Sequence, residues 1–203
     1  MNKCQKCRKF NQKLFLKGER CDLPKCAFTR NVASSTGPMA GKTKKTYRRK
    51  KSEYGLQLSE KQKAKAQYGI RERQLANIFK KANQAPTATG ETMLVLLERR
   101  LDNVIYRLGW APSRSQARQM INHGKIKINN KKVDIPSYSV KIKDIIEPKD
   151  LDSVKKQMQE KITPPTWLKY DKKTIRAEII NLPVRDDIDI TIDEQLIVEF
   201  YSR

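Results

Sequence analysis

The sequence of residues 110–135, WAPSRSQARQMINHGKIKINNKKVDI, decides the fold of the second half of the chain. Pro112 ends a preceding helix, Ser113 is a typical N-cap with Gln116 in the capping-box position, and Gly124 is a typical helix terminator. The letters KIKI then alternate basic and apolar side chains, NNK supplies a turn tolerant of positive φ, and KVDI returns as a second short strand. The stretch therefore predicts a helix followed by a β-hairpin.

The charge of the chain indicates a polyanionic partner. Of its 203 residues, 44 are Lys or Arg and 22 are Asp or Glu, a formal net charge of +22. The surplus is uneven, because residues 1–100 hold 25 basic and 7 acidic residues whereas residues 176–203 hold 3 and 7. A solubilising surface would be served by interspersed charge, and membrane binding is disfavoured by the lack of a long apolar run or a signal peptide. We therefore expect a cytoplasmic protein that contacts phosphates.

Capping signals and apolar spacing predict helices in the first two thirds of the chain. Ser59 begins a capping-box signature for a helix that ends at Gly69. Apolar residues three and four positions apart predict further helices over residues 71–82, 92–108 and 149–162.

The remaining segments are interpreted as irregular structure and strands. Residues 31–52 contain Gly, Pro and Ser followed by seven basic residues, so we expect them to be irregular in the free protein. The segments KTIRAEIINLP, DIDITID and LIVEFY predict short strands near the end of the chain. Helices followed by strands make the fold class α+β.

All four cysteines lie within the first 26 positions, at Cys4, Cys7, Cys21 and Cys26. The spacing C-x2-C and then C-x4-C is typical of a knuckle in which each pair binds one metal from a tight turn, with FNQKLFLKGER as a short hairpin between the pairs. One structural Zn²⁺ is the main interpretation, with an iron–sulfur cluster as the minor version. Redox disulfides and unliganded core cysteines are the alternatives. A catalytic zinc is disfavoured because four sulfurs leave no open position.

Four ordered blocks of sequence, which extend over the whole chain, resemble the family of bacterial small-subunit ribosomal protein four in its four-cysteine, zinc-binding form. The blocks are CQKC, KLFLKGERC and KC near the start, SEYGLQLSEKQKAKAQYGIRERQ, LLERRLDNVIYRLGWAPSRSQARQMINHGKIKINNKKVDIPSY, and PTWLKYD with LIVEFYSR. Residues 99–160 are similar to a small RNA-binding module that also occurs in some pseudouridine synthases and tyrosyl-tRNA synthetases. One departure is the segment Gly37-Pro38-Met39-Ala40-Gly41, which stands where the family has a Gly-Gln-His-Gly turn.

The resemblance implies a structural constituent of the small ribosomal subunit and not an enzyme. Its expected partners are 16S rRNA, neighbouring small-subunit ribosomal proteins and mRNA near the entry channel, with no membrane and no small-molecule substrate. It is expected to nucleate assembly of the 30S body and to contribute to translational accuracy, and the family permits repression of its own mRNA. The implied regions are residues 1–52 (zinc knuckle and basic extension), 53–98 plus 163–203 (helical body with a strand-rich C-terminal tail packed on it) and 99–162 (inserted RNA-binding module).

The candidate RNA-binding residues are basic side chains of the extension, the first helices, the module's helix and its hairpin. We expect them to contact the backbone of folded RNA, because side chains cannot easily enter the deep groove of an A-form helix. An RNA-modifying enzyme is the competing hypothesis, but its candidate acids, Asp186, Asp187 and Asp189, are more typical of a turn. The candidates are Lys42, Lys44, Lys45, Arg48, Arg49, Lys50, Lys51, Lys61, Lys63, Lys65, Arg71, Arg73, Arg114, Arg118, His123, Lys125, Lys127, Lys131 and Lys132.

Overall fold

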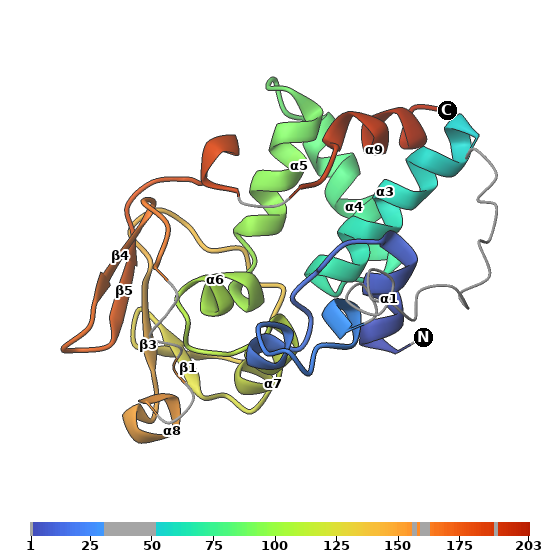
Figure 1. Ribbon diagram of the computed structural model, residues 1–203. Helices are drawn as coiled ribbons and strands as arrows, with labels where there is room; N and C mark the ends of the chain where they lie inside the picture. The colour runs from blue at the N-terminus through green and yellow to red at the C-terminus, as the bar shows by residue number, and fades with distance from the viewer. Residues whose placement is uncertain (1, 31–51, 156–157, 159–162, 189–190) are drawn as a thin grey trace.

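The computed structural model describes residues 2–30, 52–155, 158, 163–188 and 191–203. Its helices are α1 (Lys3–Phe10), η1 (Gly18–Cys21), α3 (Glu53–Tyr68), α4 (Glu72–Asn83), α5 (Thr89–Glu98), α6 (Leu101–Arg107), α7 (Arg114–Asn122), α8 (Leu151–Lys155), η3 (Arg185–Asp187) and α9 (Glu194–Tyr201). Its strands are β1 (Ile126–Ile128), β2 (Lys131–Val133), β3 (Ile145–Pro148), β4 (Leu168–Asp171) and β5 (Arg176–Ile179). Figure 1 shows the sheet at one end and α3, α4, α5 and α9 at the other. This mixture of helices and a small antiparallel sheet agrees with the α+β class.

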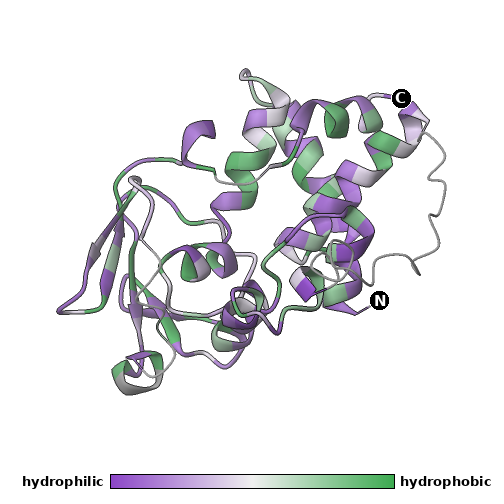
Figure 2. Cartoon of the chain, in the orientation of Figure 1, coloured by the Kyte–Doolittle hydropathy of each residue, from purple (hydrophilic) through white to green (hydrophobic). Residues whose placement is uncertain are grey.

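The helical body consists of α3, α4, α5 and α9. Its buried core includes Leu75 from α4, Leu94 and Leu97 from α5, and Ile197 from α9. Colouring by hydropathy shows hydrophobic residues on α5 and α9, whereas α1 is mostly hydrophilic (Figure 2). The predicted helix over 71–82 is confirmed by α4.

The first helix of the body begins earlier than predicted. The predicted start at Ser59 is wrong, since α3 begins at Glu53 and the Oγ of Ser52 accepts a hydrogen bond from the backbone N–H of Gly55. A glycine weakens a helix interior, but in the first turn its N–H is free to bind a cap. The predicted end is confirmed, because Gly69 adopts a left-handed φ of 65° as the C-cap.

The predicted long helix over 92–108 is two helices, α5 and α6, with a break at Arg100. The backbone of this break bonds with a distant segment, because the N–H of Leu101 donates to the carbonyl of Tyr138 at 2.9 Å. In the same way the N–H of Val140 donates to the carbonyl of Arg99 at 2.9 Å. These bonds replace the helical ones. The apolar periodicity continues across the break, so the pattern alone could not show it.

A small module forms around the five-stranded sheet, whose strand order is β2-β1-β3-β5-β4 with antiparallel neighbours. The predicted hairpin is confirmed: β1 pairs with β2, and both residues of the turn, Asn129 and Asn130, have positive φ values of 49° and 64°. The predicted helix before it is also confirmed, since the Ser113 Oγ caps α7 by accepting from the N–H of Gln116 at 3.4 Å. Buried Trp110 and Trp167 belong to the core beneath this sheet.

The C-terminal third differs from its predicted structure. KTIRAEIINLP contains strand β5 as predicted, but LIVEFY forms most of helix α9. The Asp193 carboxylate caps α9 by accepting from the N–H groups of Gln195 and Leu196 at 3.1 and 3.3 Å. A good cap and burial of Ile197 against the body override the strand preference of β-branched and aromatic residues.

The C-terminal tail is shared between the two parts of the molecule. We expected residues 163–203 to pack on the body, and α9 does so against α3 and α5. Strands β4 and β5 instead extend the module's sheet, because Ile145 and Ile146 of β3 pair with Glu178 and Ala177. Of the predicted helix over 149–162, the structure gives only the short α8, and residues 156, 157 and 159–162 lie outside the described part. DIDITID forms no strand in its described residues.

An ionic cluster fastens α9 to α3 and α4. The Glu72 carboxylate accepts from the Nζ atoms of Lys61 at 2.7 Å and Lys65 at 2.6 Å and from the Tyr201 hydroxyl at 2.9 Å. The Lys61 ammonium also lies 3.9 Å from the ring centroid of Phe200. Burial raises the pKa of Glu72, but the hydrogen bonds from Lys61, Lys65 and Tyr201 outweigh burial and lower the pKa to about 2.

Replacement Glu72→Gln should destabilise the protein at neutral pH by about 1 kcal/mol, a small value because the carboxylate is partly exposed. The folded-state pKa lies below the unfolded value of about 4.5, so the stabilisation is present above pH 4.5 and is lost as pH falls towards 2. The difference in Tm between wild type and variant should therefore shrink over this interval. Glu91→Gln, at an exposed site on α5, is the matched control. A Tm difference that is constant from pH 7 to pH 2 would contradict this assignment.

Candidate nucleic-acid interface

The β1–β2 hairpin presents lysines at one edge of the sheet. Lys127 and Lys132 are paired directly across the two strands, so they share the face opposite to buried Ile126 and Ile128. Lys131 and Lys132 are exposed, while Lys125 and Lys127 are half-buried. His123 is exposed at the end of α7 and borders a hollow of about 180 Å³ with Lys125. The hairpin thus gathers the charges predicted for it.

The candidate residues of the body fall into two groups. Arg71 and Arg73, at the start of α4, are exposed. Lys61 and Lys65 bind Glu72, and Lys63 binds the Glu60 carboxylate at 3.1 Å. The first group is available to an outside phosphate, whereas the three lysines of α3 already have carboxylate partners.

Arg114 and Arg118 lie on α7, as predicted, but both are engaged within the molecule. The Arg114 Nε donates to the Asn103 Oδ1 at 2.7 Å, and its guanidinium lies 4.4 Å from the ring centroid of Tyr106 and 5.1 Å from that of Tyr68. The Arg118 Nη1 donates to the carbonyl of Gly69 at 2.7 Å. Their role as phosphate ligands stays a prediction, and their geometry shows a second use.

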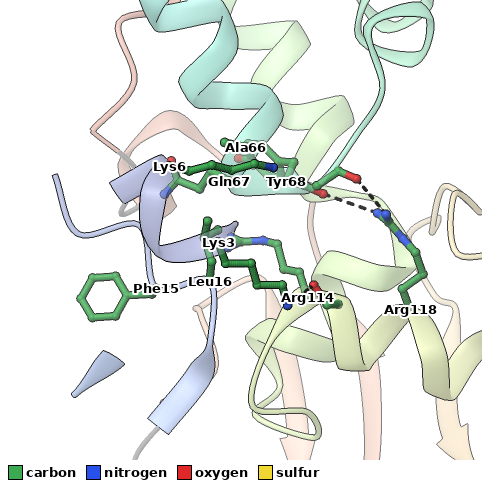
Figure 3. A pocket seen from close by; sticks show the side chains of 11 residues that line it. Lys3, Lys6, Phe15, Leu16, Ala66, Gln67, Tyr68, Arg114 and Arg118 are labelled. Atoms are coloured by element: carbon green, nitrogen blue, oxygen red, sulfur yellow. Dashed lines mark hydrogen bonds between the residues drawn. The ribbon is translucent and has the colours of Figure 1, made fainter. Parts of the chain in front are cut away.

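A small basic hollow lies between α1, the end of α3 and the start of α7. Figure 3 shows Lys3, Lys6, Arg114 and Arg118 at this hollow of about 80 Å³. The Lys3 Nζ donates to the Ser115 Oγ at 2.9 Å and so joins α1 to α7. Lys3 and Lys6 are not among the RNA-binding residues predicted from the sequence, because nothing local in the sequence places α1 beside α7.

A buried carboxylate, Glu98, organises the junction behind this hollow. It accepts hydrogen bonds from the Tyr68 hydroxyl at 2.7 Å, from the Asn103 Nδ2 at 2.7 Å and from the Arg107 Nε at 3.1 Å. Burial raises the pKa of Glu98, but the field and hydrogen bond of Arg107, the field of Arg114 and the hydrogen bond from Tyr68 lower the pKa below its usual value. Burial, with Glu98 beside it, raises the pKa of Tyr68, so this hydroxyl stays a donor. These residues were not predicted from the sequence.

The cysteine segment packs between the body and the module. Cys7 and Leu14 are buried in a small cluster with Ala66 of α3. Gly18 has a left-handed φ of 62°, and a Cβ atom there would lie 2.3 Å from the carbonyl oxygen of Pro112. Only glycine therefore permits this close approach to the module.

The cysteine pairs do not have the predicted knuckle geometry. Cys4 and Cys7 lie on helix α1 and not on a turn, and the segment between the pairs forms no hairpin. All four thiols are free, and those of Cys7, Cys21 and Cys26 are buried. Within the described residues, no group of three or more His, Cys, Asp or Glu side chains is arranged to hold a metal ion.

The pKa values of two of these thiols shift in opposite directions. Burial raises the pKa of Cys21, and the fields of Cys26 and Cys7 add to this rise. The backbone N–H of Thr29 lowers the pKa of Cys26 despite its burial. Four cysteine thiols, three of them buried, are a donor set of the chemical kind that zinc prefers.

Some predicted features lie outside the described residues or have a structural role. The candidates from Lys42 to Lys51, the segment Gly37–Gly41 and Asp189 are not described. The Asp187 carboxylate accepts from the Thr166 hydroxyl at 2.7 Å and from the N–H of Val184 at 3.1 Å, which is a turn and not an acid–base pair. In the described part of the chain, no helix combines the length and hydropathy needed to cross a bilayer.

Known proteins are similar to this chain over nearly its whole length. The family model described as ribosomal protein S4/S9 N-terminal domain matches residues 1–98, and the S4 domain model matches residues 99–146, so the two meet where α5 ends. Proteins called small ribosomal subunit protein uS4 from Dictyoglomus thermophilum and Pelotomaculum thermopropionicum are each 48% identical over 206 residues, which is 98% of this chain and 96% of theirs. The one from Thermodesulfovibrio yellowstonii is 46% identical over 208 residues, with the same coverage. The chain therefore belongs to the uS4 family of small-subunit ribosomal proteins, a family of structural proteins and not of enzymes.

Proposed function

We propose that this chain is a structural constituent of the small ribosomal subunit and binds 16S rRNA through backbone and shape contacts. The lysine-bearing hairpin beside α7 carries this proposal, because it presents cations from two paired strands within the segment that matches the S4 domain. Exposed Arg71 and Arg73 offer a second group of cations from the body. Two separated basic groups on one protein scaffold match the shape of a folded RNA better than that of a single straight RNA helix.

The finer parts of the proposal follow from this scaffold. A protein that binds two RNA segments at once reduces their freedom, so it would nucleate assembly of the 30S body. From there it would contact neighbouring small-subunit proteins and contribute to translational accuracy. The basic residues Lys42–Lys51 are proposed to lie near mRNA at the entry channel.

The chain should co-sediment with small ribosomal subunits in a sucrose gradient at physiological salt. High salt should release it, since cations bound to phosphates compete with the ions of the solution. The measurement is an immunoblot of the fractions, with a non-ribosomal cytoplasmic protein as control. Finding the chain only among the free proteins at every salt concentration would overturn the proposed function.

The combined replacement of Lys127 and Lys131 by Ala should weaken binding to a 16S rRNA fragment and flatten its salt dependence. Each lost phosphate contact should reduce the slope of log affinity against log salt by about 0.7 to 0.9. The matched control replaces Lys172 and Lys173, which are exposed in the β4–β5 turn, by Ala. Equal effects of the two pairs would show that net charge, and not the hairpin, determines binding.

We further propose that Cys4, Cys7, Cys21 and Cys26 bind one structural zinc ion. The spacing of the pairs, the burial of three thiols and the absence of disulfides among all four support this proposal. Metal would hold the sulfurs together and stabilise a segment whose own buried cluster, around Cys7, Leu14 and Ala66, is small. An iron–sulfur cluster is the alternative occupant.

Replacing Cys7 or Cys26 by Ser should remove one equivalent of zinc and expose the N-terminal segment to protease. The measurements are metal content by mass spectrometry and the rate of cleavage within residues 1–30. Ala27→Ser, which introduces the same hydroxyl at a neighbouring site, is the control and should change neither. Retention of both metal and protease resistance in the cysteine variants would refute the zinc site, and iron in the wild type would indicate the cluster.

A further inference from the structure

The helical body and the module are joined by the chain twice, between α5 and α6 and between β5 and α9. Their apolar residues form two separate cores, one around Leu94 and one around Trp110. Parts of a chain that do not share a core move relative to each other unless contacts at the junction prevent it. The orientation therefore depends on polar and charged side chains at the junction, namely the Glu98 network that joins α3 to α6 and Arg118, which joins α7 to the end of α3.

Arg118 connects the two parts directly (Figure 3). Its Nη1 donates to the carbonyl of Gly69 at 2.7 Å, and its Nη2 lies 3.5 Å from the carbonyl of Tyr68. The last carbonyls of a helix have no partner within the helix and carry negative partial charge. One guanidinium thus donates a hydrogen bond to one carbonyl at the end of α3 and lies at the limit of hydrogen-bond distance from the carbonyl before it, a forked geometry that a lysine cannot reproduce.

The direction of the Arg118 side chain is fixed from within the module. The Asp102 carboxylate is almost fully buried and accepts from the Arg118 Nε at 3.2 Å. The same carboxylate accepts from Arg100 Nε at 3.1 Å and Arg100 Nη2 at 2.9 Å. Because Asp102 is itself held by Arg100, it orients the Arg118 guanidinium towards α3.

We propose that Arg118 is a positioning residue that sets the angle between body and module, and through this angle selects RNA junctions of one geometry. The inference rests on the proposed RNA-binding function. Arg71 and Arg73 lie on the body, whereas Lys127 and Lys131 lie on the module. A change of angle changes the spacing between these two basic groups, and RNA recognised by shape must match that spacing.

The first test measures the angle without RNA. Residual dipolar couplings of the full-length chain report the orientation of the sheet relative to α3 and α4. Arg118→Lys keeps the charge but loses the fork, so it should shift or broaden the orientation while each part keeps its own spectrum. Arg73→Lys, an equally conservative change at an exposed site, should leave the orientation unchanged.

The second test measures selectivity. Affinities are compared for a 16S rRNA junction, for the same junction with an inserted bulge that alters its angle, and for a plain RNA duplex. Arg118→Lys should reduce the preference for the native junction about tenfold while leaving duplex affinity unchanged. A direct phosphate contact by Arg118 would instead weaken binding to all three RNAs.

The outcomes separate this inference from the proposed function. An unchanged orientation in Arg118→Lys overturns the positioning role whatever the RNA results are, and so does an unchanged preference. Absence of binding to every RNA by the wild type overturns the proposed function, while the orientation result still decides what Arg118 does. If Arg118→Lys does not fold, Arg118→Gln replaces it, and failure of both to fold would assign Arg118 to stability and overturn the positioning role.

Discussion

The buried carboxylate of Glu98 is the constraint on which the arrangement of body and module depends. Its side chain is about 1% exposed, and an isolated carboxylate in such a place would be strongly unfavourable. Its partners come from both parts, since Tyr68 belongs to α3 of the body while Asn103 and Arg107 belong to α6 of the module. The charge is compensated when α3, α5 and α6 meet as observed, so Glu98 holds the two parts in contact at α5 and α6, and the contact of Arg118 with the end of α3 acts on that joint.

Several elements followed from the sequence because their signals are local. The Ser113 cap, the glycine after α7 and the two asparagines of the hairpin each act within a few residues. The break at Arg100 and the helix α9 could not be predicted in this way. The break is caused by hydrogen bonds to residues some forty positions away, and α9 by burial against the body. Pairing of β5 with β3 likewise depends on contacts that no local pattern contains.

The candidate site, like the fold, could be predicted from the sequence only in part. Composition and hairpin spacing identified the exposed lysines. A lysine that faces solvent needs no partner distant in the sequence, so local sequence is enough to predict it. Spacing also placed Arg114 and Arg118 on one helix correctly. It could not show that tyrosine rings, an asparagine and the carbonyls at the end of α3 already surround them. Buried acids and hydroxyls, such as Glu98 and Tyr68, carry no sequence signal that distinguishes them from surface residues.

The net charge of +22 therefore overstates the number of cations available for RNA. Lys61, Lys63 and Lys65 have carboxylate partners, and Arg118 binds both Asp102 and backbone carbonyls. An arginine held in this way would have to exchange existing bonds for a new one, so its gain from a phosphate is smaller than that of an exposed lysine. In the proposed function, basic residues at the junction therefore act on RNA by positioning the two parts of the scaffold, whereas those on the hairpin and at the start of α4 act by contact. Under this proposal, shape and not charge alone would determine which RNA is bound.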